Sequence, residues 1–393
     1  MRIAHVIDAY QSQLGYQESA LAECQQRAGH EVHVVTGDRY APVLRRLGYS
    51  RAARRGVAIE NGVTVHRLPV RFELPGEGNR VWLGGLEATL LQLHPDFVHV
   101  HNILTFTAWR VGRVHARRKF RLVFDSHMAA FNSLPERSAL LGGLRRAYYT
   151  IARRVWLSQI EAGACALVAV GEPERDFMVS QFGIDPARIQ IIRLGADTGH
   201  FYPDAAARAD TRARWGVPAD DVVLVHAGGI RPSKKLELLV EAGLALLREG
   251  APVHVVVIGS GDRRYMQRLQ QHTQQSGFAR NFNWLPFAPR DELGTLLNGA
   301  DIAVWPGDQS NTIVEAMAVG LPLATVQSEY AVNLAGAGGR YFKADDVEAM
   351  LAALRPLVCD PAARAAVGRA ALVRVQTELN WEVVSERFLA LCG

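Results

Sequence analysis

The amino-acid sequence predicts an α/β protein with two tandem doubly wound, Rossmann-like domains that face each other across a cleft. Strand-like apolar runs alternate with helical runs along the chain, as in α/β folds. These runs are continuously apolar, which is typical of parallel strands buried on both faces. The alternation of strand-like and helical runs begins again after residue 219, and a length of 393 residues also favours more than one domain.

The first domain is expected over residues 1–193. It opens with the strand-like run RIAHVID, continues with a helix over about residues 16–28, which Gly29 ends, and then has the run EVHVVT. Later runs of the same kind are VTVHRL, FVHVH, RLVFDSH and ALVAVG. Helical segments between them complete the predicted doubly wound pattern.

The second domain is expected over residues 194–376, with residues 203–219 as a connector rich in proline, aspartate and alanine. Its strand-like runs are DVVLVHAGG, VHVVVIGSG, NFNWLP, DIAVWPG and LPLATV. The chain from Asp345 to Leu391 is expected to be helical throughout, with Asn380 capping the last helix. We expect residues 377–393 to pack back on the first domain, and ligands to bind beyond the carboxyl ends of the strands.

Composition excludes several classes of protein. With 49% hydrophobic and 21% charged residues, the chain can bury full cores, which excludes a disordered protein. It lacks the roughly 18 consecutive apolar residues of a membrane span, and its start resembles a strand rather than an export signal, so a cytoplasmic protein is expected. The four cysteines form no CxxC pair, which argues against a zinc knuckle or a disulfide framework.

Positive charge is concentrated in the first half of the chain. Residues 1–190 contain 24 lysines and arginines against 17 aspartates and glutamates, whereas the remainder contains 20 against 22. Such a bias suits an anionic membrane surface or a phosphorylated substrate, and no basic and aromatic pattern indicates nucleic acid. A helix over residues 140–155 would carry an apolar stripe with arginines elsewhere. It is either a core helix with a solvated face or a peripheral membrane helix that uses Arg145, Arg146, Arg153 and Arg154.

The run GGIRPSKKLELL, residues 228–239, follows a strand and precedes an amphipathic helix. Its glycines allow a tight turn, and Arg231, Lys234 and Lys235 gather where the helix dipole favours anions. This pattern predicts a diphosphate site, although solvated cations in an ordinary loop are the alternative. A Walker A loop is absent, the first strand lacks the GxGxxG turn of a dinucleotide site, and the GSG at 259–261 is only a weak signal.

A second polar loop lies within WPGDQSNTIVEAMAVGLPLAT, residues 305–325. Ser310, Asn311 and Thr312 can offer hydroxyl, amide and backbone donors to phosphate, and Glu315 can accept from ribose hydroxyls. The spacing of Thr312 and Glu315 also fits a capping box, in which Glu315 would only satisfy a backbone N–H. Both interpretations stay open.

Two histidines on one strand, His99 and His101, share a face, which would suit a metal. The sequence identifies no third ligand. We therefore expect these side chains to pack or to cap a loop, and we predict no metal site.

Taken in order along the whole chain, these segments resemble glycosyltransferase family 4, the retaining, nucleotide-sugar-dependent enzymes of the GT-B type. The most specific feature is EAMAVGLP at 315–322, which follows the lysine-bearing loop. The other matching segments are GHEVHVVT, PDFVHVHN, VFDSH, RLGADTGHFYP and the closing NWE.

The resemblance implies that Lys234 and a nearby arginine grip the donor diphosphate and that Glu315 holds the donor ribose. It implies that His127 faces the transferred sugar. It also implies that Gly15 lets the first loop approach the reaction centre, although Tyr16 follows it where the family usually has a second glycine.

Two further positions depart from the family pattern. Gly229 stands where the family usually has arginine, so Arg231 would supply that charge. Gly307, beside Asp308, replaces the first of two carboxylates eight residues apart.

The predicted activity is transfer of a sugar from a nucleotide diphosphate sugar to an acceptor hydroxyl with retention, in cell-surface polysaccharide or glycolipid synthesis. The resemblance implies that the leaving phosphate takes the acceptor proton, so no protein nucleophile is assigned. No metal or further cofactor is expected, because Lys234, Arg231 and helix N-termini would neutralise the diphosphate. The inner face of the cytoplasmic membrane is one expected location.

The sequence leaves two alternatives open. One is a nucleotide-sugar epimerase on the same fold, and the other is a non-catalytic nucleotide-sugar-binding scaffold subunit, which Gly229 and Gly307 favour. The sequence does not specify the sugar or the base of the donor, the acceptor, the linkage or the oligomeric state.

Overall fold

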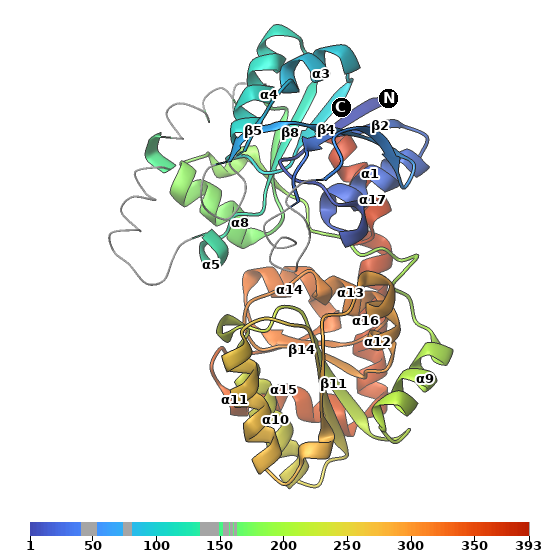
Figure 1. Ribbon diagram of the computed structural model, residues 1–393. Helices are drawn as coiled ribbons and strands as arrows, with labels where there is room; N and C mark the ends of the chain where they lie inside the picture. The colour runs from blue at the N-terminus through green and yellow to red at the C-terminus, as the bar shows by residue number, and fades with distance from the viewer. Residues whose placement is uncertain are drawn as a thin grey trace. The chain divides into compact units, whose positions relative to one another are not determined.

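The computed structural model describes residues 1–40, 53–73, 81–133, 149–151, 157, 160 and 163–392. The chain divides into two compact units, one of Met1–Arg193 with Trp381–Gly393 and one of Leu194–Asn380. Each unit has a mainly parallel sheet with helices packed on it (Figure 1). The prediction of two Rossmann-like α/β domains is therefore confirmed.

In its described part, the first unit is built on an eight-stranded sheet in the order β10-β9-β8-β7-β1-β2-β4-β3. All neighbouring strands are parallel except β3 and β4. The apolar pattern does not predict β3, because most of this edge strand is exposed. The strands are β1 (Arg2–Val6), β2 (Glu31–Gly37), β3 (Gly56–Glu60), β4 (Val63–Leu68), β7 (Phe97–Val100), β8 (Arg121–Ser126), β9 (Ala166–Ala169) and β10 (Ile189–Ile191), and a separate pair is β5 (Val70–Glu73) with β6 (Val81–Leu83).

The two faces of the first sheet differ in chemistry. Successive residues of a strand point to opposite faces. Ala4, Val6 and Phe124 join an apolar core with α3 (Leu86–Leu93) and α4 (Phe106–Arg117). The alternate positions carry buried polar side chains that contact α1 (Gln17–Arg27) and α17 (Trp381–Ala390), two helices that pack on each other. In the described part of this unit there are also five short helical segments: η1 (Ser12–Leu14), α5 (Ala130–Ser133), α8 (Glu172–Phe177), η3 (Met178–Phe182) and η4 (Pro186–Arg188).

The second unit has a six-stranded, fully parallel sheet in the order β13-β12-β11-β14-β15-β16. Alternate residues of β11 enter two apolar cores, one with α10, α11 and α15 and the other with α12, α13 and α16. The strands are β11 (Val222–Ala227), β12 (Val253–Ile258), β13 (Phe282–Leu285), β14 (Ile302–Trp305), β15 (Leu323–Val326) and β16 (Gly339–Phe342). The helices are α10 (Leu236–Arg248), α11 (Arg263–Gln275), α12 (Arg290–Asn298), α13 (Thr312–Ala318), α14 (Glu329–Ala335), α15 (Val347–Cys359) and α16 (Pro361–Glu378).

One expectation about the second half of the chain is wrong. The expected connector at 203–219 contains helix α9 (Ala205–Trp215), because the Asp204 carboxylate caps its first turn. The segment from Asp345 to Leu391 is helical almost throughout, as predicted; it consists of α15, α16 and α17, and the Asp360 side chain caps the start of α16. The Asn380 amide donates to the carbonyls of Val375 and Gln376 at the end of α16.

The strand orders fix where ligands can bind. In the first sheet β1 lies between β2 and β7, and in the second β11 lies between β12 and β14. The order reverses between β1 and β7 in the first sheet and between β11 and β14 in the second, and the carboxyl ends of strands at such a reversal are where doubly wound sheets bind ligands. Most of the predicted site residues lie in the loops that follow β1, β11 and β14.

The loops after β11 and β12 lie backbone against backbone. Gly259 has a φ of 151°, and a Cβ atom there would collide with the carbonyl oxygen of Gly228. At Gly261 a Cβ atom would collide with the carbonyl oxygen of Ile230. The Gly228 N–H donates to Ile258 across the same contact. The GSG motif is therefore explained by close packing of two loops.

We expect Gly259→Ala to lower the free energy of unfolding of the second unit by about 3 kcal/mol, because it adds a backbone collision to a strained φ. The matched control is Gly229→Ala, since a Cβ atom there has no neighbour within 4 Å. That control should change stability by less than about 0.5 kcal/mol. Denaturant unfolding measures both variants, and equal stabilities would contradict the packing role of Gly259.

Candidate functional site

Lys234 joins the two predicted ligand loops of the second unit. It ends the short 3-10 turn η5 (Pro232–Lys234), and its side chain is almost fully buried. The ammonium donates to the carbonyl oxygens of Asp308 at 2.8 Å and Gln309 at 2.6 Å, in the loop after β14. Burial, assisted by the nearby Arg231 cation, lowers the pKa of Lys234 to about 8. Lys234 is therefore part of the framework of the site.

The same contact explains why position 307 is glycine. A Cβ atom at Gly307 would collide with the carbonyl oxygen of Ser233 and lie 2.7 Å from the carbonyl carbon of Lys234. The Asp308 N–H donates to the Ser233 carbonyl over 3.0 Å. A carboxylate cannot occupy position 307 while the lysine turn packs here. By contrast, Gly229 is exposed and has open space around it.

The three cations of the first loop differ in what they already bind. Lys234 is bonded to the two carbonyls, and Lys235 forms an ion pair with Asp345 at 3.0 Å. Arg231 is exposed, and its guanidinium makes no hydrogen bond or ion pair within the described residues. Of the three, Arg231 is the cation most readily available to an incoming anion.

A chain of hydrogen bonds fixes the loop after β14. The Thr312 hydroxyl donates to the carbonyl of Ala227 at 2.6 Å, so the Ser310 hydroxyl must donate to Thr312 Oγ1, also at 2.6 Å. Ser310 in turn accepts from Trp305 Nε1 at 2.9 Å. Both hydroxyl protons are thus used inside the protein. This arrangement differs from the expectation that both hydroxyls are free donors.

Of the two interpretations left open for Glu315, the structure does not show the capping box. Asn311 is the N-cap residue of α13, and no side chain caps that helix. The Glu315 carboxylate is half-buried and makes no hydrogen bond within the part of the chain that the structure describes. Burial raises the pKa of Glu315 to about 7, against the opposing effect of Arg290. A partly buried carboxylate without a partner is suited to accept from a ligand.

In the first unit, the loop after β1 contains Gly15 and Tyr16. Gly15 ends η1 with a φ of 61°, a left-handed conformation that favours glycine. Tyr16 precedes α1 and is 43% exposed. His127 follows β8; its side chain is 40% exposed, and its Nε2 atom lies 3.9 Å from Asp125 Oδ1. These residues are accessible, as contacts with a substrate require.

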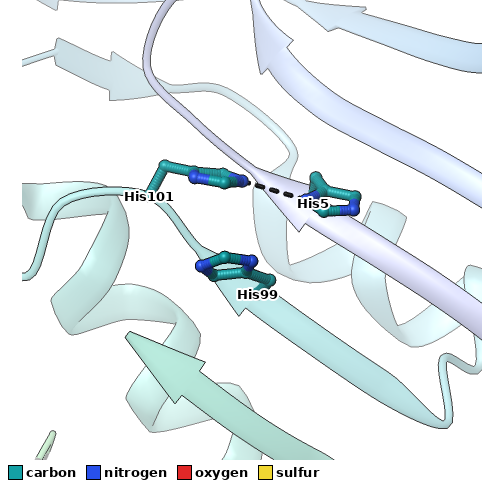
Figure 2. Close-up of side chains that lie close together, drawn as sticks. All are labelled: His5, His99 and His101. Atoms are coloured by element: carbon teal, nitrogen blue, oxygen red, sulfur yellow. Dashed lines mark hydrogen bonds between the residues drawn. The ribbon is translucent and has the colours of Figure 1, made fainter. Parts of the chain in front are cut away.

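The buried carboxylate of Asp125 organises the histidines of the first unit. His99 Nε2 and His101 Nδ1 each lie 2.9 Å from Asp125 Oδ2, and the Asn102 N–H donates to Oδ1. The structure adds His5, which the sequence did not point to (Figure 2). His5 is far from these residues in sequence, and only the parallel pairing of β1 with β7 places it opposite His99.

The predicted basic patch of Arg145, Arg146, Arg153 and Arg154 lies outside the described residues. From the predicted apolar stripe, Ile151 is described and is 62% exposed. Among the helices that the structure describes, none has the length and apolar character needed to cross a membrane.

Known families match most of the chain. Residues 18–195 match the family described as glycosyl transferase 4-like domain, and residues 221–360 match glycosyl transferases group 1. The D-inositol 3-phosphate glycosyltransferase of Kineococcus radiotolerans is 29% identical over 81% of this chain and 76% of its own length.

Solved structures share the fold over nearly the full length. The sucrose-phosphate synthase of Thermosynechococcus elongatus superposes with a TM-score of 0.70 at 18% identity and covers 99% of this chain and 98% of its own. HepE of Anabaena, solved in complex with UDP, gives a TM-score of 0.71 at 15% identity and covers 99% of both chains. With its two Rossmann-like domains and both family matches, the chain belongs to the family 4 type of GT-B glycosyltransferases.

Proposed function

We propose that this glycosyltransferase moves a sugar from a nucleotide diphosphate sugar to an acceptor hydroxyl with retention at the anomeric carbon. The observation that carries the proposal is that an exposed cation, Arg231, and a half-buried carboxylate, Glu315, follow the adjacent strands β11 and β14, and that neither side chain forms a hydrogen bond or ion pair within the described residues. Such an edge is where doubly wound sheets bind ligands. HepE, which shares the fold, has been solved with UDP and with UDP-glucose.

The diphosphate would bind to Arg231 and Lys234. An ammonium has three donors, and Lys234 uses two of them for carbonyls, so one is left for a phosphate oxygen. An anion beside Lys234 would also favour its charged form. These two cations would neutralise the leaving diphosphate, so the proposal needs no metal there.

The loop after β14 would complete the donor site. Glu315 would accept hydrogen bonds from the ribose hydroxyls. Since the Ser310 and Thr312 hydroxyl protons are already donated, Ser310, Asn311 and Thr312 would meet phosphate through backbone N–H groups. Asp308, fixed by the Ser233 carbonyl and the Lys234 ammonium, would line the sugar side.

In the first unit, His127 would position the sugar and stabilise charge in the transition state, with Gly15 and Tyr16 beside the acceptor. The leaving phosphate would take the acceptor proton on the same face. The basic first half suits an anionic acceptor, such as a lipid-linked one in polysaccharide or glycolipid synthesis. A phosphorylated small acceptor is the alternative, which the name of the Kineococcus relative supports.

The activity is tested by incubating the full chain with a panel of nucleotide sugars and candidate acceptors. Acceptor-dependent release of nucleoside diphosphate, with the anomeric configuration retained in the product by NMR, is the expected result. Isomerised nucleotide sugar without acceptor would instead indicate an epimerase. Nucleotide binding without any turnover would indicate a scaffold subunit.

We expect Arg231→Ala to weaken binding of the preferred nucleoside diphosphate by about 10- to 100-fold while leaving the melting temperature unchanged, because the exposed guanidinium serves only the ligand. Lys234→Ala should lose affinity and also stability, since two carbonyls lose their donor. The matched control is Lys235→Ala, whose side chain is paired with Asp345. Calorimetry that finds equal affinities for Arg231→Ala and Lys235→Ala would remove Arg231 from the site.

Glu315→Gln separates the ribose role from a structural role. Because the folded-state pKa of Glu315 is about 7, above its ordinary 4.5, the carboxyl group's contribution to stability is full below pH 4.5 and is lost as pH rises through 7. Glutamine does not ionise, so the variant should be more stable than the wild type at pH 8 by about 1 to 3 kcal/mol, with no difference near pH 4.5. Its nucleotide affinity should nevertheless fall. A variant that is less stable at every pH, with unchanged affinity, would restore the capping role.

A further inference from the structure

Three buried histidines meet at the reversal point of the first sheet. His5 lies on β1, His99 on β7, and His101 directly after β7. One ring nitrogen from each can be chosen so that all three atoms lie within 4.8 Å of one another. Figure 2 shows the His99 ring beside the pair formed by His5 and His101.

The protons on two of these rings follow from Asp125. The Asn102 N–H donates to its Oδ1 atom and the Gln17 amide to its Oδ2 atom, so this buried carboxylate acts as an acceptor. His99 Nε2 and His101 Nδ1 must then carry the protons that they share with it. In a neutral His101 ring, Nε2 then holds a lone pair.

The hydrogen bonds of His5 place two lone pairs opposite each other, one on His5 and one on His101. Its Nε2 atom lies 2.8 Å from Gln25 Oε1, which is an acceptor, so Nε2 carries the proton. In a neutral His5 ring, Nδ1 then holds a lone pair. That lone pair faces the lone pair of His101 Nε2 across 2.9 Å. His99 Nδ1 is also buried, and it has no hydrogen-bond partner among the described residues.

A second histidine pair in the same unit shows no such conflict. His33 Nδ1 lies 3.1 Å from His66 Nε2, and His33 Nε2 lies 3.1 Å from Glu31. His33 therefore accepts at Nδ1, and His66 can donate from Nε2, because no acceptor faces its other nitrogen in the described part of the chain. One proton satisfies this pair, whereas with neutral rings the cluster of His5, His99 and His101 holds three lone pairs that no donor among the described residues meets.

We propose that His5, His99 and His101 bind one divalent transition-metal ion of the zinc class. Neutral imidazole nitrogens suit such ions, and three histidines are a known ligand set for zinc. Asp125 and Gln25 would hold the outer ring nitrogens, which is how the second shell of metal-bound histidines is usually built. The buried carboxylates of Asp125 and Glu18 would offset the charge of the ion.

This site is separate from the donor loops, which belong to the other unit. The ion would tie the carboxyl ends of β1 and β7 together. Through Asp125, whose Oδ1 lies 3.9 Å from His127 Nε2, it would also help to position that accessible side chain. Because all three ligands are buried, the ion would be acquired while the unit folds.

The test uses the full chain carrying Cys392→Ser, because the Cys165 and Cys392 thiols hydrogen-bond to each other and could bind zinc themselves. This parent is expressed with added zinc, dialysed against a chelator and analysed for metal. About one zinc per chain is expected. Cobalt in place of zinc should give visible bands without the sulfur-to-cobalt bands of a thiolate site. A folded parent without zinc would overturn the proposal and mean that a proton joins His5 to His101, with the Gln25 amide turned to donate.

Two variants locate the ion. His5→Gln should weaken zinc binding by more than about 100-fold, since loss of even a second-shell partner costs about 10- to 100-fold. His66→Gln, from the pair without a conflict, should bind zinc like the parent. Equal zinc content in the two variants would overturn the proposal. If His5→Gln does not fold, the cobalt spectrum of the parent decides, because a three-histidine site and a surface site differ in band intensity.

Discussion

Backbone contact at the carboxyl edge of the second sheet is the constraint on which the candidate donor site depends. The loops after β11, β12 and β14 approach so closely that only glycine fits at positions 259, 261 and 307. The Lys234 ammonium then bonds the first loop to the third. This packing gives a physical reason for the missing carboxylate at position 307, because a side chain and the lysine turn cannot share that space.

The predicted site residues divide according to the hydrogen bonds that they already make. Lys234, Ser310 and Thr312 are engaged with the protein, so they shape the loops. Arg231 and Glu315 are not engaged within the described residues, so their charges are available to a ligand. A phosphate binds best where donors are already oriented, and a framework of satisfied hydrogen bonds provides that orientation without reorganisation.

At the carboxyl edge of the first sheet, hydrogen bonds between side chains take the place of the backbone contacts seen in the second unit. Asp125 gathers His99, His101 and the Asn102 N–H around one buried carboxylate. On this face, the polar centre lies between the sheet and the helices α1 and α17, where Phe388 packs 4.5 Å from the His99 ring. The last helix of the chain thus belongs to the first unit, and it covers polar rather than apolar side chains.

The sequence by itself determined the fold class, most strands and the loops that carry the donor residues, because apolar runs and turn residues are local signals. It did not indicate the exposed edge strand β3 or the capped helix α9. Only the tertiary structure decided that Glu315 does not cap its helix, that Lys234 binds carbonyls and that His5 joins His99 and His101. The physical reason is that these contacts join residues far apart in the chain, and their meeting depends on strand order and register, which no local pattern encodes.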